Sequence, residues 1–179
     1  MDIKTIIEDI TLKPTQKRNI IVDCIQEGSF TIKEIEICSK VLDDKYMAII
    51  LEAMESACSK EPKIASLKWL EFAKIYLTSE HNSLKRESSR IIGNIASYYP
   101  NHLNLVIPKL LENAKNKSTV IKWGSAYALG RIISIPKYAK SELYEILLRV
   151  YKKEMENGVK TQYLIGLRNA KMIRKTNKA

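Results

Sequence analysis

Hydrophobic side chains recur three and four residues apart along most of the chain, and no long segment alternates with a period of two. The first spacing places apolar residues on one face of an α-helix, whereas the second would indicate β-strands. Capping residues, glycines and prolines divide the pattern into segments. We therefore predict helices with these approximate bounds: 2–10, 15–27, 31–42, 43–59, 61–76, 84–98, 101–114, 119–134, 138–156 and 159–175.

Several of these boundaries depend on single residues. Thr15 is the expected N-cap of the second helix, and Gly28 is expected to close it. Pro108 either kinks the 101–114 segment or lies in the first turn of a helix that starts later. The Asn157-Gly158 pair is expected to end the 138–156 helix.

One segment, from Lys122 to Ile133, combines a cation with small residues at fixed offsets. Its sequence is KWGSAYALGRII, so that Ser125, Ala126 and Gly130 follow the lysine at offsets of three, four and eight. A glycine inside a helix costs about 1 kcal/mol relative to alanine. Its presence here indicates that a neighbouring helix approaches closely.

The same arrangement recurs along the chain. Lys85 is followed by small residues at the same offsets as Lys122, and Lys160 heads a less regular copy. The three lysines are 37 and 38 residues apart, close to the ~40–47 residues of HEAT and armadillo repeats. Fainter copies follow Arg18 and Asp44.

This recurrence resembles the HEAT-repeat (armadillo-like) α-solenoid family. The resemblance implies an all-α fold, a right-handed α-α superhelix of about five helix pairs. It is stronger over 61–175, whereas 1–60 would hold degenerate or capping repeats of a single domain, 1–179. Stability would then depend on the interfaces between neighbouring repeats.

The charge of the chain is unevenly distributed. Residues 1–80 carry a net charge of −3, and residues 81–179 carry +13, giving +10 in total. Such asymmetry is a hint of an anionic partner such as a nucleic acid. A solvated surface with a basic tail at 171–178 explains the same charge, and the sequence leaves both interpretations open.

Cysteine and histidine offer little chemistry. Cys24, Cys38 and Cys58 are odd in number, without a CxxC pair, and lie among apolar residues, so we expect buried free thiols. His81 and His102 fall in predicted turns, without partners at ligand spacing. We expect no metal, no cofactor and no small-molecule substrate.

The sequence also lacks an apolar run long enough for a transmembrane helix, and its start does not resemble a secretory leader. We therefore expect no membrane contact and a cytoplasmic location.

Catalytic signatures are equally sparse. The sequence contains no P-loop, GxGxxG, HExxH or GxSxG motif. One HEAT-like family, the alkylpurine DNA glycosylases, uses an aspartate beside tryptophans. Here no aspartate follows Asp44, although Glu87 could substitute and Trp123 lies in the same half. We predict that the protein is not an enzyme.

What remains is a binding surface. In HEAT-type stacks the second helix of each pair lines the concave face, where partners commonly bind. Residues at offsets of one, five and nine from the lysine avoid the small-residue face. They are Arg86, Arg90, Asn94, Trp123, Tyr127 and Arg131.

These side chains suit two kinds of partner. Arginine and aromatic residues are enriched at protein interfaces, and they also suit phosphates and stacked bases. Trp123 and Tyr127 could instead pack against an adjacent helix, and the sequence does not decide between surface and core. Lys85, Lys122 and Lys160 either contact an anionic ligand or, as the resemblance implies, form contacts between repeats.

Two functions follow from this surface. The first hypothesis is a scaffold without enzymatic activity that binds a partner protein through the concave face. The alternative is a HEAT-like protein that binds nucleic acid through its basic C-terminal half. A glycosylase-like enzyme is a third and weaker hypothesis.

Overall fold

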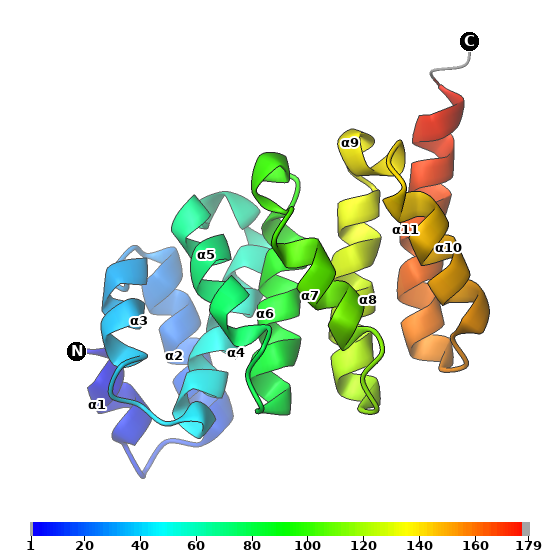
Figure 1. Cartoon of the computed structure of the whole chain (residues 1–179). Helices are drawn as coiled ribbons and strands as arrows, with labels where there is room; N and C mark the ends of the chain where they lie inside the picture. The colour runs from blue at the N-terminus through cyan, green and yellow to red at the C-terminus, as the bar shows by residue number, and fades with distance from the viewer. Residues whose placement is uncertain (1, 177–179) are drawn as a thin grey trace.

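The computed structural model describes residues 2–176, which form helices and no strand. The five longest helices are α2 (Pro14–Gln26), α4 (Asp44–Lys60), α6 (Asn82–Ile95), α8 (Thr119–Ile133) and α11 (Asn157–Lys175). Each of them packs against the next along the chain, so that they form one row (Figure 1). The all-α prediction is therefore confirmed.

Shorter helices cover one side of this row. They are α1 (Ile3–Glu8), α3 (Ile32–Cys38), α5 (Leu67–Tyr76), α7 (Val106–Asn113), α9 (Pro136–Ala139) and α10 (Leu143–Lys153). Two short 3-10 helices, η1 (Pro62–Ile64) and η2 (Pro100–His102), precede α5 and α7. α1 packs on α2, α5 on α6, α7 on α8 and α10 on α11, so these four shorter helices each lie against the long helix that follows them.

Local capping explains several helix starts. The Asp2 carboxylate accepts from the Thr5 backbone N–H at 2.8 Å, and that of Asp43 accepts from Tyr46 at 3.0 Å. Each bond satisfies one of the backbone donors that a helix start leaves free. A glycine marks the C-terminal end of α2. Gly28 adopts a φ of +76°, a conformation that glycine tolerates best. Gly28 therefore ends the helix as predicted.

Some predicted boundaries are wrong. α2 begins at Pro14, and Lys13 is its N-cap, because Pro14 has no N–H to lose at the first helical position. Gln16 completes the start by accepting the Lys13 backbone N–H at 2.8 Å. Thr15 consequently lies in the first turn and is not the cap. The late start that Pro108 allowed is confirmed, since α7 begins at Val106.

Two segments predicted as single helices are divided. Residues 61–76 form η1 and α5, separated by extended backbone at Ala65 and Ser66. In place of one helix over 138–156, the structure has two, α9 and α10, and α9 already starts at Pro136. The Asn157-Gly158 pair lies at the start of α11 and does not end α10, which stops at Lys153.

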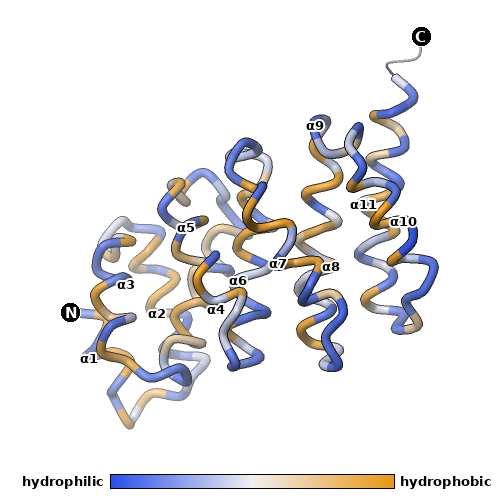
Figure 2. The backbone as a smooth tube through the Cα atoms, viewed as in Figure 1, coloured by the Kyte–Doolittle hydropathy of each residue, from blue (hydrophilic) through white to orange (hydrophobic). Residues whose placement is uncertain are grey.

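The buried hydrophobic side chains form one continuous cluster from Ile3 to Ala170. Hydrophobic segments recur in every long helix, and hydrophilic ones dominate the loops (Figure 2). Across residues 2–176, no helix is both long enough and apolar enough to cross a bilayer. The end of the basic tail, from residue 177 onward, lies outside the described residues.

Candidate functional site

Glycines bring α6, α8 and α11 into close contact. A Cβ at Gly93 would lie 3.0 Å from the Cα of Ala128, and one at Gly130 would lie 2.6 Å from the carbonyl oxygen of Gln162. A Cβ at Gly166 would meet the carbonyl oxygen of Gly130 and lie 2.5 Å from its Cα. The small residues recognised in the sequence therefore mark the faces on which these helices touch.

The predicted binding residues lie together on another face of the same helices. α6 supplies Arg86, Arg90 and Asn94, and α8 supplies Trp123, Tyr127 and Arg131. We call these six residues the α6–α8 surface. All of them are partly exposed except Arg131, which is exposed.

Aromatic and guanidinium groups are layered within this surface. The rings of Trp123 and Tyr127 stack with centroids 5.4 Å apart and an interplanar angle of 28°. The Arg131 guanidinium lies 3.7 Å from the Tyr127 ring centroid, and that of Arg90 lies 5.9 Å from both rings. Trp123 also packs on the hydrophobic core. Trp123 thus contacts the core on one side and belongs to the surface on the other.

Two buried glutamates, which the site prediction did not include, hold the arginines. Glu87 is 0 % exposed and pairs with Arg86 and Arg90, the latter at 2.9 Å. Glu55 of α4 is 3 % exposed and also pairs with Arg90, again at 2.9 Å. Buried carboxylates require such partners, because an unpaired buried charge is costly. Arg90 therefore joins α4 to α6 and is fixed before any ligand arrives.

Hydrogen bonds extend this network to α8. The Asn94 amide donates to Glu55 Oε1 at 3.1 Å, and its oxygen accepts from the Tyr127 hydroxyl at 2.6 Å. Burial raises the pKa of Glu55, and the neighbouring Arg90 and Asn94 offset only part of that rise. Burial likewise raises the pKa of Tyr127, which keeps its hydroxyl a donor. The network thus ties three successive long helices together.

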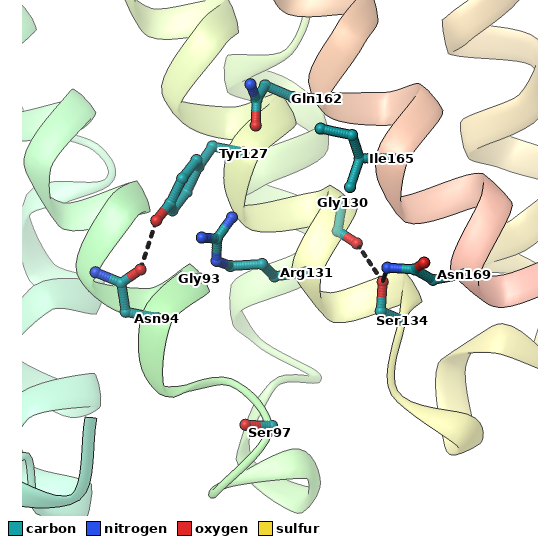
Figure 3. A pocket seen from close by; sticks show the side chains of 10 residues that line it. All are labelled: Gly93, Asn94, Ser97, Tyr127, Gly130, Arg131, Ser134, Gln162, Ile165 and Asn169. Atoms are coloured by element: carbon teal, nitrogen blue, oxygen red, sulfur yellow. Dashed lines mark hydrogen bonds between the residues drawn. The ribbon is translucent and has the colours of Figure 1, made fainter. Parts of the chain in front are cut away.

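Beside the α6–α8 surface lies an open groove of about 360 Å³ between α6, α8 and α11. Figure 3 shows Arg131 and Tyr127 on one side and Gln162, Ile165 and Asn169 on the other. Ile165 is 52 % exposed, an apolar side chain on an otherwise polar wall. The groove therefore offers a charged group, an aromatic ring, amides and one apolar contact.

The three repeat lysines differ in their surroundings. Lys122 Nζ lies 2.8 Å from Glu154 Oε1, in the segment that joins α10 to α11. Lys160 lies 5.3 Å from the Tyr151 ring centroid. The structure shows no ion pair of Lys85 with any residue from 2 to 176. Of the three lysines, therefore, only Lys122 forms an ion pair, within residues 2–176, that joins one helix pair to the next.

The cysteines have no disulfide partner among the described residues. Cys38 and Cys58 are buried as expected, whereas Cys24 is half-buried. Burial raises the pKa of Cys58 to about 12. Within residues 2–176, no three His, Cys, Asp or Glu side chains gather in a way that could hold a metal ion.

Comparisons with known proteins give little beyond the fold. No family model matches the chain, and no curated protein matches it. Among solved structures, it is similar to an engineered protein whose crystal structure was determined by the Northeast Structural Genomics Consortium. That similarity has a TM-score of 0.65 and 15 % sequence identity, and it covers 94 % of this chain and 78 % of the other. At this identity the match describes a shared helical architecture and carries no functional information.

Proposed function

We propose that this chain is a HEAT-like α-solenoid, a single right-handed superhelical domain that acts as a scaffold without enzymatic activity. In this proposal the long helices form the concave face, and a partner protein binds where α6, α8 and α11 meet. The support for the solenoid is the row of successively packed long helices and the lysine-and-glycine repeat that brings them together.

One observation carries the binding proposal. The stacked pair Trp123 and Tyr127 is half-exposed beside an open groove, with Arg131 lying on the outer ring face. Tryptophan, tyrosine and arginine are the residue types that dominate the energy of protein interfaces. Tyr127 is already held in place by its hydrogen bond to Asn94, so less conformational entropy is lost on binding.

The charge balance favours a protein over a nucleic acid at this surface. Arg86 and Arg90 are neutralised by Glu55 and Glu87. Of the three arginines of the α6–α8 surface, this leaves Arg131 as the one without an ion pair to the described residues. A phosphate backbone gains affinity from several uncompensated cations. The same pairing removes Glu87 as a catalytic base, because both of its oxygens are held by arginines.

Crosslinking tests the proposal directly. The protein, carrying a photoreactive amino acid in place of Ile165 in the groove, is incubated with an extract of the source cells and irradiated. We expect it to crosslink one discrete protein, whereas the same photoreactive group at Ile10, which is exposed between α1 and α2, should not. Arg131→Glu should abolish that crosslink, whereas Lys140→Glu, an exposed change of the same charge, should not. Equal crosslinking from both positions, or its survival in Arg131→Glu, would overturn the proposal.

A second candidate is nucleic-acid binding through the basic C-terminal half. Its support is a set of exposed cations, without ion pairs to residues 2–176, on α10 and α11: Arg149, Lys152, Lys153, Arg168 and Lys171. Fluorescence anisotropy with labelled DNA and RNA at about 50 and 200 mM salt tests it. Binding through 6–10 phosphates would weaken roughly 10³–10⁵-fold over that change. An absence of binding at the lower salt concentration would exclude it.

A further inference from the structure

A second groove, of about 520 Å³, lies on another part of the molecule. It is formed by the α7–α8 loop, by α10 and by the α10–α11 segment. In Figure 1 the two connections lie at the lower ends of α8 and α11. None of the six residues of the α6–α8 surface lines it. We call it the α10 groove.

One face of α10 provides most of the wall. Ile146, Arg149, Val150 and Lys153 are spaced by three and four residues, so they lie on the same side of the helix. Ile146 and Val150 are half-buried and supply an apolar floor, and Met155 extends it with a side chain that is 86 % exposed. Exposed methionine adapts to the shape of a partner.

Cations line the rim of this floor. Lys115 from the α7–α8 loop faces the groove together with Arg149 and Lys153. All three are exposed, and none forms an ion pair with a residue between 2 and 176. Lys153 also lies in the last turn of α10, where a cation complements the helix dipole. That role explains neither Lys115 nor Arg149, which are brought together from different helix pairs.

The carboxylate of Glu154 is already occupied and does not cancel this rim. Its Oε1 accepts from Lys122 at 2.8 Å and from the backbone N–H groups of Met155 and Glu156 at 2.9 Å. Both residues of the Lys122–Glu154 pair line the groove. Glu156, which is exposed, also lines the groove. With Lys122 and Glu154 paired, Lys115, Arg149 and Lys153 still outnumber this one carboxylate, so the net charge of the groove is positive around an aliphatic floor.

From this arrangement we infer that the α10 groove binds an acidic segment of a partner protein that inserts an apolar side chain between Ile146, Val150 and Met155. Carboxylates of that segment would face Lys115, Arg149 and Lys153, because complementary charges steer and orient association. A nucleic acid fits less well, since no aromatic ring lines the described groove for base stacking. This inference concerns a separate surface and does not depend on the proposed use of the α6–α8 surface.

The test is a selection of random dodecapeptides displayed on phage against the full chain at low salt. We expect enrichment of peptides that combine Asp or Glu with Leu, Ile or Phe. A synthetic peptide of the selected sequence should lose affinity at least about tenfold, or about 1.4 kcal/mol, in Arg149→Glu. Met155→Ala should weaken it without changing charge. Arg168→Glu, an equal charge change at an exposed residue of α11, should leave it unchanged, and circular dichroism of each variant confirms the fold.

Three results would overturn the inference. The selected peptides could lack acidic residues or fail to appear. Peptides could bind but lose affinity in Arg131→Glu and not in Arg149→Glu, which would place them on the α6–α8 surface and support the function proposed there. A labelled oligonucleotide could bind in a manner lost in Arg149→Glu while no peptide does, which would make the groove a nucleic-acid site.

Discussion

Gly130 and Gly166 meet face to face, and their contact sets the distance between α8 and α11. A Cβ at Gly166 would lie 2.5 Å from the Cα of Gly130, so no larger residue fits while the helices keep this spacing. The backbone of one helix therefore packs directly on the backbone of the other. Such contact explains why glycine is present inside two helices despite its conformational cost.

Gly166→Ala should consequently destabilise the protein. The added methyl group forces α8 and α11 apart, and overpacking of this kind costs about 1–3 kcal/mol. Chemical denaturation followed by circular dichroism measures the loss. Gly158→Ala is the matched control, because a Cβ there meets only the Trp123 side chain at an ordinary 3.7 Å. That control should be neutral or stabilising by up to about 1 kcal/mol, and equal effects of both changes would contradict the packing argument.

Replacing the buried carboxylate of Glu87 should also be costly. Glu87→Gln removes the charge that Arg86 and Arg90 share, while Arg90 keeps its pair with Glu55. We expect a loss of about 1–3 kcal/mol in the free energy of unfolding, the cost of leaving a partly buried charged group unsatisfied.

A less buried pair supplies the control for that change. Arg18 and Glu52 lie 2.9 Å apart with side chains 32 % and 39 % exposed. Glu52→Gln should cost less than about 1 kcal/mol, because water screens the pair. If the two substitutions proved equal, burial would not be what makes the Glu87 pairs matter.

The Lys122–Glu154 pair predicts a dependence of stability on pH. Burial alone would raise the pKa of Glu154, but the hydrogen bond from Lys122 and two backbone N–H groups lower it overall. Because the folded-state pKa is below the unfolded value of about 4.3, ionised Glu154 stabilises the fold above that pH. The contribution is lost as the pH falls through the folded-state pKa.

Denaturation of the wild type and of Glu154→Gln over a pH series measures this contribution. The difference in unfolding free energy should be largest near neutral pH and should shrink in acid. A difference that is independent of pH would show that the carboxylate charge is not what stabilises the α10–α11 segment.

The three thiols should react at different rates. Cys24 is half-buried, Cys38 is 8 % exposed and Cys58 is fully buried, with a pKa raised to about 12 by its burial. Thiolates are the reactive form, so both access and ionisation slow the reaction of Cys58. With a chromogenic disulfide reagent, Cys24 should be labelled first and Cys58 only on unfolding, as single Cys→Ser variants would show. Early labelling of Cys58 would mean that α4 opens locally.

Much of the helical framework could be predicted from the sequence, because burial imposes the three-and-four spacing of apolar residues on every long helix. The lysine-and-glycine repeat also identified the faces on which α6, α8 and α11 touch. Besides the two divided segments, errors lie at Thr15 and Asn157, whose side chains suit a helix boundary, whereas the start of α2 is fixed by Pro14. Near Asn157, the buried Glu154 accepts backbone N–H groups where α10 stops. The start of α2 thus depends on the local residues Pro14 and Gln16, whereas the end of α10 involves the tertiary pair of Glu154 with Lys122.

The sequence predicted the exposed residues of the candidate site but not the buried residues that hold them. The offsets from the repeat lysines placed Arg86, Arg90 and Trp123 on a common face, since helix geometry alone determines that. The partners of the arginines were missed, because glutamate is usually exposed and nothing in its side chain indicates burial. One signal was available: Glu87 and Arg90 lie three residues apart, which is the spacing of a pair on one helix face. Glu55 offered no such signal, because its partner Arg90 is on another helix.

The fluorescence of the stacked Trp123 indole can report binding to the molecule. The other tryptophan, Trp69, is 4 % exposed in α5, so its emission should be insensitive to events outside the core. Trp123 lies against Tyr127 and 5.9 Å from the Arg90 guanidinium, where a docking molecule would change its polarity and quenching. A Trp69→Phe variant would therefore report occupancy of the α6–α8 surface through intrinsic fluorescence, without any attached label.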